Sequence, residues 1–450
     1  MIPQRPIKNI PRPHHMGIVR DALERAPVVA ILGPRQVGKT TLITLFGETY
    51  FENICTVNFE QKPELKTIFD SRSPEEIIFK LELTLNEKIT PLKTLLFLDE
   101  IQESPNAILA LRYFKEEIPT LHVIAAGSLL EFALNSEEFR MPVGRVQYMY
   151  LYPFSFKEFL LAINKENLAN YLDTLSLKTQ VEPVIHQQLL ELLKRYFIIG
   201  GMPAVLQTYL DTKSYIAVQQ MQANLIQSFE DDFPKYHAKI DYKILRALFN
   251  KIPRFIGQKI KFSRLIEGET IYKIKQHLDA LRLAGLIIPI YKTKASGIPL
   301  GVDYKENQIK FLFADIGLTN KLCDLRGEIE QVSDVTLINQ GAIAEQFVGQ
   351  ELLCSAPAYE RQPLYFWERE KVGSMAEMDY VIQKGSKIIP IEVKAGKTGR
   401  LKSLQQFLTE KQAPFGLQIS QKPLGINHHI LSVPLYMMAQ LPRLIEGLTL

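Results

Sequence analysis

The stretch "ILGPRQVGKTTL" holds residue types that bind a nucleotide phosphate. Gly33, four spacers and then Gly38, Lys39 and Thr40 follow directly behind an apolar run. Two glycines let the backbone bend so that successive N–H groups face phosphate oxygens, and the lysine adds a positive charge. We expect Lys39 to reach the β- and γ-phosphates and the Thr40 hydroxyl to bind Mg²⁺.

The whole loop and the start of the following helix form the predicted nucleotide-binding surface. Its members are Gly33, Pro34, Arg35, Gln36, Val37, Gly38, Lys39, Thr40 and Thr41, joined by Asp99 from a later strand. Arg35 has two interpretations, because it could touch phosphate or simply cap the loop. The alternative to the whole pattern is a chance Gly-Lys-Thr turn.

A second stretch, "KTLLFLDEIQ", supplies a metal anchor and a water activator. It is an apolar strand that ends in Asp99 and Glu100. Asp99 can bond a Mg²⁺-bound water, and Glu100 can orient or deprotonate the attacking water. Because binding alone needs no second acid, the pair favours hydrolysis over passive binding. A solvated acidic turn is the alternative.

These residues need strands and helices that position them. Residues 26–33 predict a buried parallel strand, and residues 39–46 predict the helix that follows it. Residues 55–60 predict a further parallel strand before the acidic one along the chain. A third apolar run, residues 121–132, contains Ser128, which places a small hydroxyl beside the γ-phosphate, where it could sense hydrolysis.

The order of strand, phosphate loop, helix, strand, acidic strand and polar-tipped strand resembles AAA+ ATPases. In that family the polar tip, here Ser128, is called sensor 1. Arg145 follows the sensor strand, where AAA+ proteins often carry an arginine finger. The resemblance implies that Arg145 neutralises charge on the γ-phosphate of a neighbouring subunit in a homo-oligomer. A structural salt bridge is the alternative role.

The middle of the chain predicts helices and then a basic module. Residues 156–235 show helical periodicity, broken at "GGMP", and resemble the helical lid that follows many AAA+ cores. Residues 251–310 hold 12 Lys and Arg against 5 Asp and Glu. Within them, residues 269–294 predict a helix, a C-cap at Gly285 and a strand, and "GVDYKENQIKFLFAD" predicts the return strand of a hairpin.

Helices followed by a β-hairpin predict a winged helix over residues 236–325. Its recognition helix would project Lys273, Lys275 and Gln276 toward the phosphates or base edges of DNA. A winged helix can equally be a protein-interaction module, and a basic helix can simply be solvated, so both alternatives stay open.

The end of the chain carries three acids and a lysine. Glu345 lies on the amphipathic run 341–353, and Asp379 heads a predicted strand. Glu392 and Lys394 are two residues apart on the next strand, hence on one face. Asp379, Glu392 and Glu345 could bind a divalent cation such as Mg²⁺. Lys394 could help to deprotonate an attacking water or stabilise developing charge.

This spacing of Asp379 and Glu-x-Lys resembles the PD-(D/E)XK nuclease fold of restriction enzymes and junction resolvases. The Glu345 helix and a later helix with Gln405 fit the resemblance, whereas Met378 stands where many members have proline. The resemblance implies an α/β restriction-endonuclease-like domain over residues 326–450. Domains of this fold often lose activity, so a non-catalytic domain is the alternative.

The whole chain resembles a prokaryotic family of AAA+ ATPases with a C-terminal domain of uncharacterised function. The stretches that carry the resemblance include "GPRQVGKTTL", "LDEIQ", "AAGSLLEF", "GGMPAV", "KFLFADIGL" and "IEVKAG". At 450 residues, 46% of them hydrophobic and 23% charged, the chain is long enough for several domains. We expect an α/β fold with a P-loop ATPase core over residues 1–155, followed by the lid, the winged helix and the nuclease-like domain.

Composition excludes some classes of protein. The sequence contains no run of about 18 apolar residues, which a membrane-spanning helix would require. The N-terminus lacks the apolar segment of a secretory signal. Three scattered cysteines, Cys55, Cys323 and Cys354, fit a reducing compartment, so we predict a cytoplasmic protein. The net charge of +4 decides nothing further.

The predicted function is ATP binding and Mg²⁺-dependent ATP hydrolysis, with a nucleotide cycle that gates a DNA-binding, nuclease-like C-terminal half. The alternative is an ATP-dependent signalling or scaffold switch whose C-terminal domain binds a protein without cleavage. A metabolic kinase is disfavoured, because the first 150 residues show no second anion-binding cluster.

Overall fold

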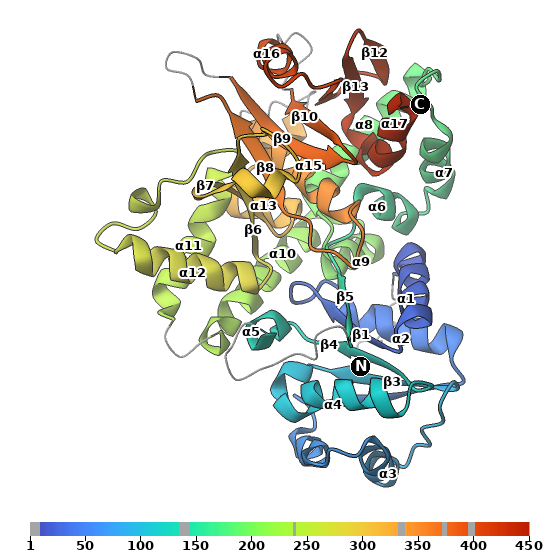
Figure 1. Cartoon of the computed structure of the whole chain (residues 1–450). Helices are drawn as coiled ribbons and strands as arrows, with labels where there is room; N and C mark the ends of the chain where they lie inside the picture. The colour runs from blue at the N-terminus through green and yellow to red at the C-terminus, as the bar shows by residue number, and fades with distance from the viewer. Residues whose placement is uncertain are drawn as a thin grey trace. The chain divides into compact units, whose positions relative to one another are not determined.

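The computed structural model describes residues 10–134, 145–236, 240–331, 338–339, 341–370, 376–394 and 401–449. The chain forms two compact units, which Figure 1 colours by position along the sequence. Unit 1 holds the N-terminal part to Tyr152 together with two short segments, Leu283–Gly285 and Pro357–Arg361. Unit 2 holds the rest of the chain.

Unit 1 is built on a parallel sheet with the strand order β2-β3-β4-β1-β5. Its strands are β1 (Val28–Leu32), β2 (Asn53–Asn58), β3 (Thr94–Asp99), β4 (His122–Ala126) and β5 (Gln147–Tyr150). Every residue of β1 and β3 is buried, as expected for parallel strands with both faces covered. The predicted parallel sheet is confirmed, whereas β5 is a short edge strand that the sequence analysis missed.

Helices cover both faces of this sheet. They are α1 (Pro13–Arg25), α2 (Lys39–Tyr50), α3 (Pro74–Leu85), α4 (Pro105–Glu117) and α5 (Leu130–Leu134), with 3₁₀ turns η1 (Pro63–Asp70) and η2 (Ile101–Glu103). Alternate residues of β1 face opposite cores: Ala30 packs with residues of α3 and α4, and Ile31 packs with residues of α1 and α2.

Unit 2 begins with helices. They are α6 (Phe156–Ala162), α7 (Glu166–Thr174), α8 (Pro183–Ile199), α9 (Pro203–Thr212), α10 (Tyr215–Asp232), α11 (Tyr242–Lys251) and α12 (Ile271–Leu283, whose last residue belongs to unit 1). Later helices are α13 (Ile316–Cys323), α14 (Arg326–Gln331), α15 (Ala342–Cys354), α16 (Lys402–Lys411) and α17 (Leu441–Thr449). The helical periodicity predicted for residues 156–235 is present, and Gly200 follows α8 with a φ of +79°.

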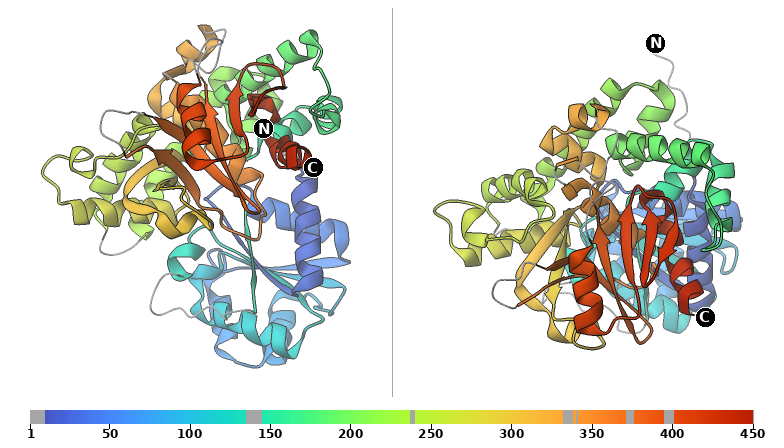
Figure 2. Two further views of the ribbon diagram at one scale, coloured as in Figure 1. Left: turned by 45° about the horizontal axis from the view of Figure 1, so that its top comes forward. Right: turned by 90° about the horizontal axis from the view of Figure 1, so that it is seen from above.

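The second sheet has eight strands in the order β12-β13-β11-β10-β9-β8-β6-β7, which lie side by side in Figure 2. They are β6 (Ile287–Thr293), β7 (Lys305–Phe313), β8 (Leu364–Glu368), β9 (Glu377–Lys384), β10 (Lys387–Val393), β11 (Gly416–Ser420), β12 (Gly425–Asn427) and β13 (Ile430–Pro434). The sheet is mixed, because β6–β8, β10–β11 and β11–β13 pair in parallel and the other neighbours pair antiparallel.

The hairpin predicted as a wing is part of this sheet. Strands β6 and β7 pair antiparallel as expected, but β6 also pairs in parallel with β8. The eight-stranded sheet therefore continues across residue 325, where the sequence analysis divides two domains. Periodicity along the chain predicts strands but does not reveal which strands pair across a long connection.

Buried polar side chains hold the break at "GGMP" in place. The carboxylate of Asp315, which is fully buried, accepts hydrogen bonds from the backbone N–H of Gly201 (2.6 Å) and of Leu318 (3.0 Å). Burial raises the pKa of Asp315 to about 6. On α15, Glu351 accepts from the N–H of Phe156 at 2.8 Å, so carboxylates satisfy backbone groups that water cannot reach.

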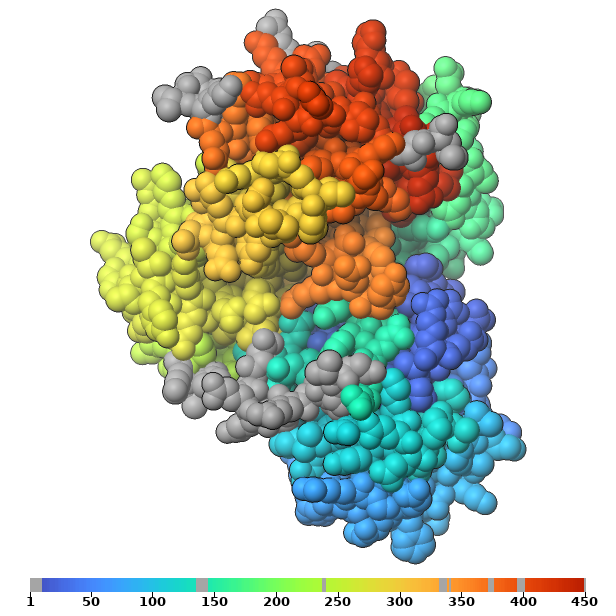
Figure 3. Space-filling model, viewed as in Figure 1, coloured from blue at the N-terminus to red at the C-terminus, as the bar shows by residue number. Residues whose placement is uncertain are grey.

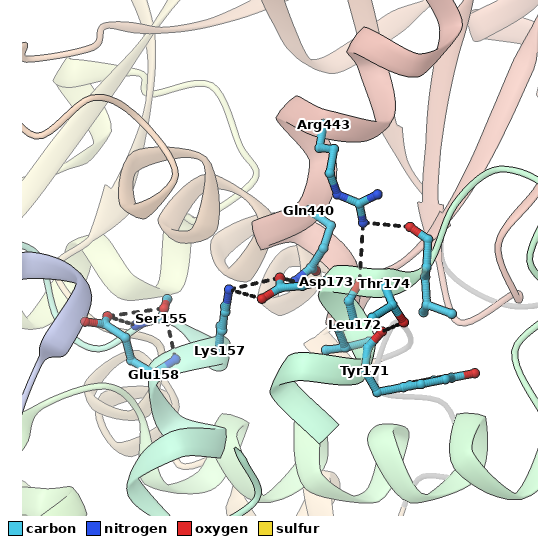
Figure 4. Close-up of polar contacts among 10 residues, drawn as sticks. Ser155, Lys157, Glu158, Tyr171, Leu172, Asp173, Thr174, Gln440 and Arg443 are labelled. Carbon is cyan, nitrogen blue, oxygen red and sulfur yellow. Dashed lines mark hydrogen bonds and ion pairs between the residues drawn. The ribbon is translucent and has the colours of Figure 1, made fainter. Parts of the chain in front are cut away.

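Polar contacts that Figure 4 draws connect α17 and the residue before it to α7, and α7 to α6. Arg443 on α17 donates to the carbonyl oxygens of Leu172 (3.4 Å) and Leu175 (2.6 Å) at the end of α7. Asp173 accepts from Gln440 (3.1 Å) and pairs with Lys157 (2.7 Å).

Over the described ranges, no helix has both the length and the apolar character needed to cross a bilayer.

Replacing Gly201 with alanine should destabilise unit 2. A Cβ atom there would lie 2.3 Å from the carbonyl oxygen of Phe154, which accepts a hydrogen bond from the buried hydroxyl of Tyr196. We expect the free energy of unfolding to fall by about 1–3 kcal/mol, measured by urea denaturation. Gly425→Ala is the matched control, because no heavy atom lies within 4 Å of its Cβ position. Equal losses in the two variants would contradict the packing argument.

Candidate functional site

The phosphate loop lies between β1 and α2, as the sequence predicts. Gly33 has a φ of +149°, and a Cβ atom there would lie 2.2 Å from the carbonyl oxygen of Leu151. Gly38 caps α2 with a φ of +93°. Both positions therefore require glycine, one for space and the other for backbone conformation.

Lys39 is folded into the loop. Its ammonium donates to the carbonyl oxygens of Gly33 (2.8 Å) and Pro34 (2.9 Å), and the residue is only 7% exposed. Burial lowers the pKa of Lys39 to about 8, although the nearby carboxylates of Glu100 and Asp99 act in the opposite direction. The hydrogen-bond partners of the ammonium are uncharged carbonyl oxygens. A phosphate that enters the loop would therefore form a stronger, ionic interaction with it.

Asp99 is surrounded by donors. Its carboxylate accepts from the Thr40 hydroxyl (3.3 and 3.4 Å), the Asn58 amide (3.0 Å) and the N–H of Glu100 (3.1 Å). Burial and then the charge of Glu100 raise the pKa of Asp99. The Thr40 hydroxyl and this carboxylate are oxygen ligands of the kind that Mg²⁺ prefers, so the pair fits a magnesium site. Asn58 ends β2 beside Asp99, which only the pairing of the strands reveals.

Glu100 is held by the strand that carries the predicted sensor. Its Oε2 accepts from the Gln102 amide (2.7 Å), the Ser128 N–H (3.2 Å) and the Ser128 hydroxyl (3.3 Å). A Cβ atom on Gly127 would lie 1.9 Å from Oε1 of Gln102, so a larger residue there would displace this amide. Glu100 and Ser128 were predicted from the sequence, whereas Gln102 was not, and its position inside "LDEIQ" was its only signal.

The two predicted arginines, Arg35 and Arg145, lie in different parts of unit 1. Arg35 is a residue of the phosphate loop, and its charge contributes to lowering the pKa of Lys39, after the larger effect of burial. Arg145 forms an ion pair with Glu116 near the end of α4 at 2.9 Å. Arg145 precedes β5, so it lies at the amino edge of the sheet, opposite the phosphate loop. The action of Arg145 on a neighbouring subunit stays a prediction.

A third arginine, which the sequence did not suggest, lies at the carboxyl edge of the same sheet. Arg361 donates to Glu131 on α5 at 2.8 Å, and its guanidinium lies 5.9 Å from the ring centre of Tyr150. Arg361 is 230 residues from its partner along the chain, so no local pattern could have found it.

The predicted C-terminal residues also come together. Asp379 on β9 accepts from the N–H of Val393 at 2.7 Å, and burial raises the pKa of Asp379 to about 6. Glu392 on β10 is 6% exposed and pairs with Lys394 at 2.5 Å. These three side chains therefore share one end of the β9–β10 hairpin. The residues after Lys394 in "KAGKTG" lie outside the described part of the chain.

A buried lysine that the sequence analysis missed joins these acids. Lys310 on β7 lies 2.5 Å from Glu377 and 3.8 Å from Glu345, and its side chain is 3% exposed. Burial alone would lower the pKa of Lys310, but the charges of Glu345, Glu377 and Asp379 raise it above its usual value. Its only sequence signal is one lysine in the apolar run "QIKFLF".

Within the ranges that the structure describes, no three His, Cys, Asp or Glu side chains are grouped so that they could hold a metal ion. The ammonium of Lys310 lies beside Glu345, which the sequence analysis predicts as a metal ligand. Metal binding by Glu345, Asp379 and Glu392 stays a prediction, and it requires these acids to rearrange around the lysine.

The basic helix α12 makes contacts within its own unit. Lys273 pairs with Glu269 at 3.2 Å. Lys275 donates to the side chain of Asn307, and its ammonium lies 5.0 Å from the ring centre of Phe262. Contact of Lys273, Lys275 and Gln276 with DNA stays a prediction.

Comparison with known proteins adds to this geometry. An AAA domain profile matches residues 25–160, and two domains of unknown function match residues 190–328 and 340–436. Over 397 residues the chain is 22% identical to the uncharacterized proteins Mb2031c of Mycobacterium bovis and Rv2008c of Mycobacterium tuberculosis. Each alignment covers 88% of this chain and 76% of the relative.

Similar solved structures include a Walker-type ATPase of Pyrococcus abyssi and RuvB of Thermotoga maritima. The first is 14% identical with a TM-score of 0.43, covering 71% of this chain and 97% of that one. The second is 17% identical with a TM-score of 0.28, covering 66% and 92%. The AAA profile match, the parallel sheet and the phosphate loop agree: residues 25–160 form an AAA-type P-loop ATPase domain.

Proposed function

We propose that this chain hydrolyses ATP in a Mg²⁺-dependent reaction at the carboxyl edge of the parallel sheet. The observation that carries the proposal is the contact network that joins Thr40 to Asp99, and Glu100 to Ser128. A nucleotide-binding protein without hydrolysis needs the loop and the metal ligands, but it has no need for a second carboxylate held beside them.

Each residue has a distinct role in this proposal. The loop N–H groups and Lys39 bind the phosphates, and Thr40 and Asp99 hold Mg²⁺, which supplies neutralising charge when it is bound. Glu100 orients the attacking water and accepts its proton. Ser128 and Gln102 fix the rotamer of Glu100 through three hydrogen bonds, so the base is positioned before the nucleotide arrives.

Substitution should separate binding from hydrolysis. Lys39→Ala should abolish ATP binding, because it removes the one lysine of the loop. Glu100→Gln should keep ATP binding and lower kcat by at least about 100-fold, because an amide cannot accept the proton of the water. Phosphate release and calorimetry measure the two effects.

The matched control for Glu100→Gln is Glu103→Gln, three residues further on. Glu103 pairs with Lys66 at 3.1 Å on the surface and should leave both quantities unchanged. Hydrolysis by Glu100→Gln at the rate of the Glu103→Gln control would contradict the proposed base.

ATP affinity should fall as the pH rises above about 8. Lys39 loses its proton through a pKa of about 8 in the free protein, whereas bound phosphates would raise that pKa. Binding must then take up a proton, so the association constant should drop by up to about tenfold per pH unit above pH 8. Calorimetric titrations between pH 7 and 9.5 measure the slope.

Lys39→Arg is the control for this pH dependence, because a guanidinium stays charged throughout the range. Its affinity is expected to be lower but to follow no such slope. A wild-type protein with the same flat profile would show that Lys39 does not titrate on binding.

We propose further that the nucleotide cycle gates a nuclease-like C-terminal half that binds DNA. The arrangement of Asp379, Glu392 and Lys394 at the end of one hairpin supports this proposal. The ion pairs of Lys310 with Glu345 and Glu377 favour the alternative, a non-catalytic domain that binds a protein. The lysine already neutralises these two carboxylates, so they have less need of a metal ion.

Plasmid nicking discriminates between these two functions. The wild-type protein should nick supercoiled DNA in Mn²⁺ or Mg²⁺ at low salt, and DNA should stimulate its ATP hydrolysis. Asp379→Asn should lose nicking, whereas the control Asp303→Asn, in the 3₁₀ turn Leu300–Asp303, should not. Equal nicking by wild type and Asp379→Asn would point to contamination and favour the scaffold function.

A further inference from the structure

A cavity of about 430 Å³ lies in unit 2 among α16, β11 and the β12–β13 hairpin. These elements are at the top of the views in Figures 1 and 3. The polar residues that line it include Gln405, Thr409, Gln418, Lys422 and Ser432. The volume falls in the range of small-molecule sites, and the ATPase proposal does not use this cavity. Of the residues named for the nuclease-like domain, Gln405 lines the cavity and Glu392 lies on the strand beside it.

One of these residues has an unused donor. Gln418 is 3% exposed, and its Oε1 accepts from the hydroxyl of Ser432 at 3.2 Å. In this orientation of the amide, Nε2 of Gln418 is buried and has no hydrogen-bond partner among the described residues. Buried donors in folded proteins are nearly always paired, so this amide indicates a partner that the described residues do not supply.

The neighbouring strand holds the complementary atom. Glu392 on β10 pairs in register with Gln418 on β11, so both side chains lie on the same face of the sheet. Oε1 of Glu392 is bound by Lys394, while Oε2 is buried and has no partner among the described residues. A single hydroxyl group satisfies both atoms, because it donates to the carboxylate and accepts from the amide.

The charged and polar residues that line the cavity indicate which group, besides the hydroxyl, its ligand carries. The carboxylate of Glu392 beside the cavity is paired with Lys394, whereas Lys422 and two histidines line the cavity and contribute cationic or hydrogen-bonding groups. Leu401, Leu408 and Ile430 add an apolar wall. Ammonium and imidazole groups beside amide and hydroxyl donors suit a phosphate oxygen.

We propose that this cavity binds a small hydroxylated phosphate. A hydroxyl of the ligand lies between Glu392 and Gln418, and its phosphate lies against Lys422. Free sugar phosphates and the ribose phosphate of a nucleotide share this chemistry. The site is separate from the phosphate loop, since all of its residues belong to unit 2.

Calorimetric titration of the full-length Lys39→Ala protein tests the proposal without binding at the phosphate loop. Ribose 5-phosphate, AMP and inorganic phosphate are the three probes. We expect ribose 5-phosphate or AMP to bind at least about tenfold more tightly than inorganic phosphate, and the tighter of the two identifies the source. No binding by either compound, or equal binding by inorganic phosphate, would overturn the proposal.

Two variants assign the binding to the cavity. Lys422→Met should weaken every probe at least about tenfold, because it removes the ammonium that contacts phosphate. Gln418→Met keeps the size of the side chain and should remove the preference for the sugar phosphate over inorganic phosphate. Lys387→Met, on β10 but outside the cavity, is the control. Because Lys422 is partly exposed, its variant should fold even if Gln418→Met does not, and wild-type affinity in Lys422→Met overturns the proposal.

Discussion

The parallel pairing of β1, β3 and β4 is the constraint on which the nucleotide site depends. Parallel strands end at the same edge of a sheet, so residues far apart in the chain become neighbours there. Asp99 pairs in register with Ala126, the last residue of β4, and Gly127 and Ser128 follow directly. A shift of one residue in this register would turn the Asp99 carboxylate to the other face and break its bond to Thr40.

Local patterns in the sequence were enough to predict the phosphate loop, the acidic pair, and the strands of unit 1 that carry them. Each predicted site residue in this unit comes directly after a strand whose sequence is a continuous apolar run. The adjacent sequence is therefore enough to identify the loop glycines, Lys39, Thr40 and the acidic pair. Asn58 and Gln102 could not be predicted in the same way. Their roles come from which strand lies next to β3 and from the left-handed turn at Glu100, whose φ is +50°. Pairing and turn geometry are properties of the folded chain.

In unit 2, local sequence patterns predict even less of the tertiary structure. Its strands and helices were predicted segment by segment, but β6 joins β8 in one sheet, and this brings Lys310 of β7 toward acids on α15 and β9. Those partners lie 35 and 67 residues further along the chain, beyond the reach of any helical or strand period. Asp379, Glu392 and Lys394 were predicted from their spacing and Glu345 from the helix that precedes them, whereas Glu377 was not predicted. The lysine that neutralises their neighbours was hidden in an apolar run.

Two buried lysines now distinguish the two candidate sites. Lys39 donates to backbone carbonyls, and its pKa is lowered because burial outweighs the attraction of nearby carboxylates. Lys310 contacts two carboxylates, and its pKa is raised because they outweigh its burial. An anion that reaches Lys39 therefore relieves an unfavourable charge, so phosphate binding and lysine protonation strengthen each other. A divalent cation that approaches the C-terminal acids meets the opposite situation, because it must first displace an ammonium that these acids already stabilise.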